Sequence, residues 1–527
     1  MTESVDETAL ATVQMHRPRW GDPDAGIEMP SAASQFVTEG ASPRAAVLPA
    51  AALTEAARAA LVAVVGPDGI DVEDDGRVDH TRGYSTPDLL RLLAGDASDA
   101  PDAVVYPADA DAVVGVLRTC ARHRLAVVPF TGGTSVVGGL TPDRAGFVGV
   151  VSVDLRRMDA LVEIDEISRI ATFQAGIRGT RAEELLRTAG YTLGHFPQSY
   201  AGAGLGGYAA TRSAGQSSAG YGRFDDMVEG LTLATGDGLL TLGTAPKSAA
   251  GPDLRQVVLG SEGAFGIITE VRVRIHRQPQ VRVFEGWRFP DFDAGADALR
   301  RLAQDGPMPT VLRLSDEVET ALNLADPARL GADPGGCLVV AGFEGAAADV
   351  RWRQSAAATV FSDAGAQSLG AEPGEAWRTG RFRGPYLRDP MLASGVLVET
   401  LETACFWSRL HQVKQAVTAA LTETLTAAGA PPAVLCHISH VYHSGASLYF
   451  TVVAPLGDDP LITWAQAKSA ATDAIRATGA TITHHHGVGR DHRTAFHGEI
   501  GPLGVEILTA IKTALDPDGI CNPGILL

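Results

Sequence analysis

The residues best suited to chemistry lie near the C-terminus, where positions 483–489 read Thr-His-His-His-Gly-Val-Gly. Histidine is a poor core residue, and three in a row cannot all face one side of a helix or strand. Glycine lets the backbone pass close to a ligand, because no Cβ stands in the way. We therefore expect His484, His485 and His486 to line the edge of a pocket. The alternative is an exposed polar turn.

A histidine-rich tract can also bind a metal ion. Adjacent imidazoles diverge, however, and no cysteine or carboxylate stands at ligand spacing near the run. A metal is therefore the weaker interpretation, and the sequence predicts no metal site.

Four loops rich in glycine and hydroxyl groups form the second chemical feature of the chain. The first follows an apolar run and consists of Pro129, Phe130, Thr131, Gly132, Gly133, Thr134 and Ser135. Successive N–H groups exposed by glycine suit a diphosphate, although this loop matches neither the P-loop nor the dinucleotide fingerprint. Taken alone, it is also compatible with a ligand-free glycine turn.

The other three loops contain Gln198, Ser199, Tyr200, Ala201, Gly202, Ala203 and Gly204, then Thr211, Arg212, Ser213 and Ala214, and finally Glu262, Gly263, Ala264, Phe265, Gly266, Ile267 and Ile268. Four such loops at the ends of expected strands imply a long, extended, polyphosphorylated cofactor.

The surrounding sequence divides into four predicted parts, which are residues 1–95, 96–278, 279–480 and 481–527. The first part contains an extended arm, to about residue 45, and one helix. The second begins with strand, helix and strand and indicates an α/β domain. The third alternates helices with strands, as in an antiparallel sheet covered by helices. The fourth returns with the histidines and a helix over 502–515, where proline is tolerated in the first turn.

Composition limits the classes of function. A chain of 527 residues indicates two or three domains, and a formal net charge of −19 argues against a nucleic-acid partner. An anionic ligand must then be held by a few well-placed arginines. Five scattered cysteines and no apparent signal peptide favour free thiols in the bacterial cytoplasm.

The four loops, in this order and spacing, resemble the PCMH-type FAD-binding domain of the vanillyl-alcohol oxidase family. The resemblance implies an α+β fold, with a two-subdomain FAD-binding domain and an α+β cap domain containing an antiparallel sheet. It places residues 129–135 at the diphosphate, 198–204 and 211–214 beside the flavin, and 262–268 on the adenosine side. Some members attach flavin through a histidine in the first loop. That loop has no histidine or cysteine here, so noncovalent FAD is expected.

The second half resembles alkyldihydroxyacetonephosphate synthase and its bacterial relatives, on residues 311–314, 385–389, 402–404, 442–450 and the histidine run. That family exchanges the acyl group of an acyl dihydroxyacetone phosphate for a fatty alcohol in ether lipid biosynthesis, through a transient adduct at flavin N5. By resemblance Tyr449 is the acid/base, Arg388 binds substrate, Arg313 is a second active-site arginine, and His484, His485 and His486 position or polarise substrate. A homodimer, an anionic lipid-like substrate and possible peripheral membrane contact are further expectations.

Arg381 and Arg383 are expected to be solvated charges. The main alternative is a flavin-dependent 2-hydroxyacid dehydrogenase, whose cap carries two metal-binding histidines and a Glu-His-Gly motif. Tyr442, Tyr449 and His485 stand at the corresponding positions here, so the ligand set of a divalent ion is missing. His437, His440 and His443 lie nearby and leave an altered site open. A flavin-binding protein without catalysis is a third interpretation.

Overall fold

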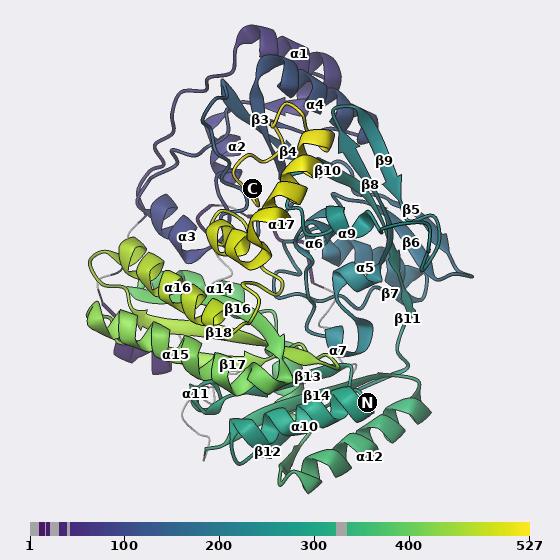
Figure 1. The fold of residues 1–527 in the computed structure, drawn as a ribbon, viewed down its shortest axis with the longest axis vertical. Coiled ribbons are helices and arrows are strands. Elements are labelled where there is room, and N and C mark those ends of the chain that lie inside the picture. Colours follow the sequence, from purple (N-terminus) through teal and green to yellow (C-terminus); the bar gives the residue numbers. More distant parts are fainter. Residues whose placement is uncertain (1–9, 16, 22–30, 39, 41–42, 323–334) are drawn as a thin grey trace.

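The computed structural model describes residues 10–15, 17–21, 31–38, 40, 43–322 and 335–527. Two main hydrophobic cores divide the molecule, one in the first half of the chain and the other in the second. Figure 1 shows these as an upper part, purple to teal, and a lower part, largely green. The C-terminal helix, in yellow, returns to the upper part. No helix among the described residues is long and apolar enough to cross a membrane.

The upper part contains a four-stranded sheet, in the order β1-β2-β4-β3, and a five-stranded antiparallel sheet, in the order β5-β6-β10-β8-β9. The strands are β1 (Ile70–Asp71), β2 (Ala103–Val105), β3 (Leu125–Phe130), β4 (Gly149–Asp154), β5 (Leu161–Asp165), β6 (Ile170–Gln174), β8 (Val228–Thr235), β9 (Gly238–Leu242) and β10 (Ile267–Arg274). β7 (Tyr191–Thr192) pairs with β11 (His276–Arg277).

Its helices are α1 (Glu55–Val65), α2 (Asp74–Asp79), α3 (Thr86–Leu93), α4 (Ala110–His123), α5 (Gly179–Thr188), α6 (Leu205–Thr211), α7 (Ser218–Tyr221), α8 (Phe224–Met227) and α9 (Arg255–Val258). α4 connects β2 to β3 along the chain, and both strands run parallel to β4. The side chain of Asp109 accepts the N–H of Ala112 and caps the N-terminus of α4. The expected strand-helix-strand order at 104–129 is thus confirmed.

The lower part is built on a seven-stranded antiparallel sheet, in the order β15-β12-β14-β13-β17-β18-β16. Its strands are β12 (Val281–Phe289), β13 (Val311–Ser315), β14 (Cys337–Gly345), β15 (Gln367–Gly370), β16 (Val396–Phe406), β17 (Ala433–Ile438) and β18 (Gly445–Pro455). The helices are α10 (Phe292–Asp305), α11 (Glu317–Leu322), α12 (Ala347–Asp363), α13 (Glu372–Gly380), α14 (Gly384–Ala393), α15 (Leu410–Ala427) and α16 (Pro460–Ala477).

Strand alternation gives this sheet two different faces. On β18, Leu448 and Phe450 belong to the core that α10, α12, α15 and α16 complete. Tyr449 and Thr451, one residue out of phase, line a cavity on the opposite face. Successive side chains point to opposite sides of a strand. The apolar residues of β18 therefore pack against the helices, and the polar residues between them face the cavity.

Both ends of the chain contain structure that the sequence did not predict. The last helical element, α17, spans Arg493–Leu515 and consists of two helices separated at Gly501, where φ is +70°. The second of these begins at Pro502, as expected, whereas the first was not predicted. The described parts of the N-terminal arm are not simply extended: Met15 and Trp20 are buried, and Ser31–Phe36 forms a 3-10 turn. Residues 1–9, 16, 22–30, 39, 41 and 42 lie outside the described residues.

Candidate active site

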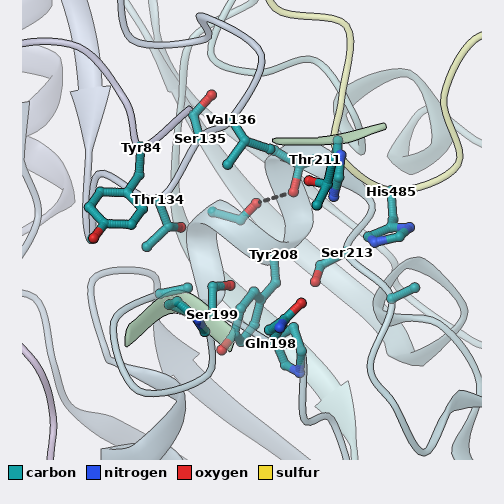
Figure 2. Close-up of a pocket in the computed structure, with 18 of the residues that line it drawn as sticks. Tyr84, Thr134, Ser135, Val136, Gln198, Ser199, Tyr208, Thr211, Ser213 and His485 are labelled. Atoms are coloured by element: carbon teal, nitrogen blue, oxygen red, sulfur yellow. Dashed lines mark hydrogen bonds between the residues drawn. The ribbon is translucent and has the colours of Figure 1, made fainter. Parts of the chain in front are cut away.

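A cavity of about 420 Å³ lies between the two parts of the molecule. The first loop leaves β3, the second precedes α6, the third follows α6, and the fourth leads into β10. Figure 2 shows their polar side chains converging, with Thr134, Gln198, Ser199 and Ser213 around the same space as His485. The loops therefore meet at one site, as their composition indicated.

The first loop has the form of an anion cradle. No hydrogen-bond acceptor among the described residues lies against the backbone N–H groups of Gly132, Gly133 and Thr134. A Cβ at Gly132 would meet the carbonyl oxygen of Gly202 at 1.9 Å, and Gly133 has a φ of +66°. Unpaired buried donors are costly, so this loop is suited to a negatively charged ligand such as a diphosphate.

Other features of the wall also fit a large polar cofactor. A Cβ at Gly207 would have no neighbour within 4 Å, because this face of α6 is open to the cavity. The buried oxygens Tyr208 Oη, Gln216 Oε1 and Asn522 Oδ1 lack partners in the described part of the chain. All three residues line the cavity. The arrangement fits the FAD expected from the loops.

Most of the predicted cofactor residues lie on this wall. They are Pro129, Phe130, Thr131, Gly132, Gly133, Thr134, Ser135, Gln198, Ser199, Ala203, Gly204, Thr211, Ser213, Ala214, Glu262, Gly263, Gly266, Ile267 and Ile268. The residues that do not line it are Tyr200, Ala201, Gly202, Arg212, Ala264 and Phe265. Their surroundings explain this: Tyr200 packs on Phe196 and Phe382, and Arg212 donates to the carbonyl oxygens of Leu259 and Gln256.

Several wall residues were missed by sequence reasoning. Trp20 and Tyr84 line the cavity and are tied to α14, since the Trp20 N–H and the Tyr84 hydroxyl both donate to Asp389. Arg17 donates to the carbonyl oxygen of Gly133, so the N-terminal arm supports the first loop. Asn522 donates to the carbonyl oxygens of Gly139 and Glu262. No local motif marks these positions, because each depends on a contact between distant segments.

Tyr449 stands on the cavity face of β18, with the His437 ring stacked on it at a centroid distance of 4.8 Å. Burial raises the pKa of Tyr449 to about 12, although the Thr400 hydroxyl and Arg388 favour the phenolate. Burial lowers the pKa of His484, His485 and His486. In these surroundings neutral imidazoles face a protonated tyrosine, and the positive charge that favours the phenolate comes from Arg388.

Arg313 belongs to a buried charged group beside Tyr449. Its Nη2 lies 2.6 Å from Glu319 Oε1 and 3.0 Å from His437 Nδ1. Burial alone would raise the pKa of Glu319, but His437 and Arg313 together lower it to about 2. The carboxylate therefore remains ionised and balances the arginine at the cavity wall.

Three further arginines reach the cavity from the α13–α14 region. Arg388 stacks on the Tyr84 ring, 4.5 Å from its centroid, and its Nη1 lies 3.9 Å from Glu399 Oε1. Arg381 is only 5% exposed and lies over the rings of Phe196, Trp377 and Phe382. The expectation that Arg381 is a solvated charge is therefore wrong. Arg383 also lines the cavity.

Glu402, on β16, holds the histidine run in place. Its Oε1 accepts from the Thr483 hydroxyl at 2.6 Å and from the backbone N–H groups of His485 and His486 at 3.2 and 3.0 Å. Its Oε2 accepts the N–H of His484 at 2.6 Å. Burial alone would raise the pKa of Glu402, but the imidazoles of His485, His486 and His484 hold it below its ordinary value.

Glu262, from the fourth loop, holds the glycine end of the same run. Its carboxylate accepts the N–H of Val488 at 2.8 Å and the N–H of Gly489 at 3.0 and 3.1 Å. The run is thus bound by one carboxylate from each part of the molecule. His485 and His486 line the cavity, whereas His484 does not.

His484 instead contacts Tyr442, outside the cavity wall, and His485, which belongs to that wall. Its Nε2 lies 2.6 Å from Tyr442 Oη, and its Nδ1 lies 3.0 Å from His485 Nδ1. Adjacent histidines were expected to diverge. However, the ring nitrogens of His440, His484 and His485 lie within 4.8 Å of one another, close enough for one ion to join them. A carboxylate also lies nearby, brought to the run by β16.

Comparison with known proteins identifies the family. Residues 101–243 match the model of the FAD binding domain, and residues 278–526 match that of the FAD linked oxidases, C-terminal domain. The chain is 34% identical to alkyldihydroxyacetonephosphate synthase of Trypanosoma brucei brucei over 88% of this chain and 79% of that protein. It is 31% identical to an uncharacterized FAD-linked oxidoreductase, YgcU, of Escherichia coli (strain K12), over 80% of this chain and 88% of the relative.

A solved structure of alkyldihydroxyacetonephosphate synthase superposes with a TM-score of 0.78 at 26% identity, covering 97% of this chain and 90% of that one. The expected PCMH-type α+β fold and the FAD cofactor are thereby confirmed. The chain is an FAD-dependent enzyme and belongs to the alkyldihydroxyacetonephosphate synthase family.

Proposed function

We propose that this enzyme exchanges the acyl group of an acyl dihydroxyacetone phosphate for a fatty alcohol, with FAD bound noncovalently. The observation that carries the proposal is one cavity, lined both by the predicted flavin loops and by Arg313, Tyr449, His485 and His486. The curated synthases align with the chain over most of its length, which supports the same reaction class.

The polar residues of the cavity have different roles in the proposed reaction. Arg388 binds the phosphate, because its planar guanidinium can donate two parallel hydrogen bonds to oxygens. Tyr449 holds a proton at Oη near neutral pH and exchanges it with the substrate carbon. Arg313 keeps a positive charge on the cavity wall, with Glu319 as its counterion. FAD, when bound, supplies an electrophilic ring next to these groups.

The apolar portion of the wall suits a lipid-like chain. Met391, Val398 and Val453 line the cavity on the side of Arg388 and Tyr449. Apolar side chains favour an alkyl chain over a small hydrophilic acid. A phosphate held by arginine with an alkyl tail against this wall is the substrate form that we propose. A homodimer, peripheral membrane contact and a location in the bacterial cytoplasm complete the proposal.

The test compares two reaction classes on the purified yellow protein. In one arm, acyl dihydroxyacetone phosphate and hexadecanol are supplied, and release of the fatty acid and formation of the ether are measured together. In the other, glycolate, lactate and 2-hydroxyglutarate are supplied with an artificial electron acceptor. We expect exchange without net reduction of the acceptor. Acceptor reduction by a hydroxyacid, with no ether formed, would assign the chain to the dehydrogenase alternative.

A further inference from the structure

Tyr442 lies between the histidine run and a second hollow on the surface. This groove has a volume of about 620 Å³ and is lined by Tyr442, Phe406, Ser444 and other residues of β16, β18 and α17. Phe406 is 63% exposed, so the groove is open to solvent. The groove and the cavity share no lining residue. The side chains of Tyr442, His484 and His485 bridge the wall between them.

The direction of the hydrogen bonds along this bridge follows from Arg223. Its guanidinium lies close to the Tyr442 hydroxyl and favours a negative charge there. A guanidinium has donors but no acceptor, so the phenol O–H cannot donate to it and is left to donate elsewhere. The acceptor is His484 Nε2, at 2.6 Å. His484 therefore carries no proton on Nε2.

Neutrality then fixes both tautomers. Burial lowers the pKa of His484 well below its ordinary value and also lowers that of His485, so both rings are neutral near pH 7. A neutral His484 without a proton on Nε2 must carry it on Nδ1, which donates to His485 Nδ1 at 3.0 Å. His485 in turn must carry its proton on Nε2. Since His485 lines the cavity, that N–H is the one available to a ligand there.

We propose that Tyr442, His484 and His485 form a proton relay between the surface groove and the catalytic cavity, with His485 Nε2 as its inner end. The role in turnover rests on the proposed function, whereas the tautomers do not. A base in the cavity takes the proton from His485 Nε2, and His485 Nδ1 takes the proton of His484 Nδ1. His484 Nε2 then takes the proton of Tyr442 Oη, which is replaced from water in the groove.

The charges around the relay suit this movement. Arg223 faces the phenolate that Tyr442 becomes in the inward passage. In the outward passage His485 receives a proton from the cavity, and Glu402 Oε2, 3.6 Å from His485 Nδ1, balances the positive charge that develops on the ring. One passage inverts both tautomers, so the next passage in the opposite direction restores them. An exchange reaction has two halves, one expelling the acyl group and one admitting the alcohol. The relay can therefore work inward in one half and outward in the other.

The tautomers can be tested without any substrate. The FAD-loaded protein is labelled with ¹⁵N-histidine, and the signals are assigned by their loss in the variants His484→Gln and His485→Gln. We expect the Nδ1–H form for His484 and the Nε2–H form for His485. In Tyr442→Phe, His484 should become a mixture of tautomers, whereas in the control Tyr106→Phe it should not change. An Nδ1–H form or an imidazolium at His485 in the native protein would overturn the relay.

Turnover supplies the second measurement. Tyr442→Phe keeps the ring and removes only the hydroxyl, so FAD affinity and KM should stay near those of the native enzyme. We expect kcat to fall by about 10²-fold, the low end for a lost proton-transfer group, and to recover as imidazole buffer is added. A native kcat, or a low kcat that imidazole does not restore, contradicts the relay. Failure of the native enzyme to catalyse the exchange refutes the proposed function, while the tautomer measurement still decides the relay.

Discussion

Replacing Glu402 by glutamine should destabilise the protein strongly, although the side chain keeps its size. The carboxylate is 2% exposed and accepts four hydrogen bonds, three at Oε1 and one at Oε2. Glutamine can keep the three at its carbonyl oxygen, but its NH₂ then faces the N–H of His484 without an acceptor. A lost hydrogen bond to a charged group costs about 1.5–3 kcal/mol. The three remaining hydrogen bonds become weaker, because their acceptor is now a neutral amide oxygen and no longer a carboxylate. We expect a total loss of about 3–5 kcal/mol.

The assay is urea unfolding of the FAD-loaded protein, followed by circular dichroism, with Glu423→Gln as the control. Glu423 lies exposed on α15, so its amide variant should unfold within about 0.5 kcal/mol of the native protein. Flavin fluorescence on the same samples reports whether FAD remains bound. If Glu402→Gln unfolds at the same urea concentration as Glu423→Gln, the histidine run is not held by this carboxylate and the reasoning fails.

The stability difference between the native protein and Glu402→Gln should depend on pH in a defined direction. The pKa of Glu402 is lowered in the folded protein, so the folded state binds fewer protons than the unfolded state between the two values. Stability from Glu402 is therefore fully present above about pH 5, just above the ordinary glutamate pKa, and is lost as pH falls further. The difference between native protein and Glu402→Gln should be constant at pH 6–8 and shrink in acid. A difference that grows in acid would contradict the assignment.

Four further predictions concern the cofactor and the cavity. Acid precipitation should leave FAD in the supernatant, since the first loop has no histidine or cysteine for a covalent link; flavin retained by the precipitate would refute this. Tyr449→Phe should bind FAD normally but lose turnover by about 10²-fold or more, and a native rate would reduce Tyr449 to a packing residue. Arg388→Lys should raise KM at least several-fold, because an ammonium cannot replace the planar fork; an unchanged KM would exclude it from the site. EDTA should leave turnover unchanged, because Nδ1 of His484 and Nδ1 of His485 already engage each other; activity lost to EDTA and restored by zinc would indicate an ion at His440 and these two residues.

Local chemistry made the cofactor loops predictable from the sequence. Glycine and hydroxyl residues at strand ends have few roles, and a loop such as 129–135 carries its conformation within its own residues. Pro502 likewise indicated the start of the last helix, whereas the helical segment between Arg493 and the break at Gly501 was not predicted.

Contacts between distant segments were not predictable in this way. Arg381 resembled a surface charge, because only the folded chain brings the ring of Phe196 against it. The same holds for Glu402, which binds a run more than 80 positions later, and for Tyr442, whose hydroxyl meets His484. A sequence indicates residue types suited to chemistry, whereas the partner that fixes a protonation state depends on the tertiary fold.

The two carboxylates on the histidine run link cofactor binding to catalytic geometry. Glu262 belongs to the loop beside the expected FAD, and it holds the N–H groups of Val488 and Gly489. Glu402 belongs to the sheet that also carries Tyr449, its partner across the strand pair β16–β18. Any shift of one part of the molecule against the other must therefore move an anchor of the run. His485 and His486 take their places opposite Tyr449 only while both anchors hold, so the arrangement of these rings reports how the flavin loop and the substrate sheet are positioned relative to each other.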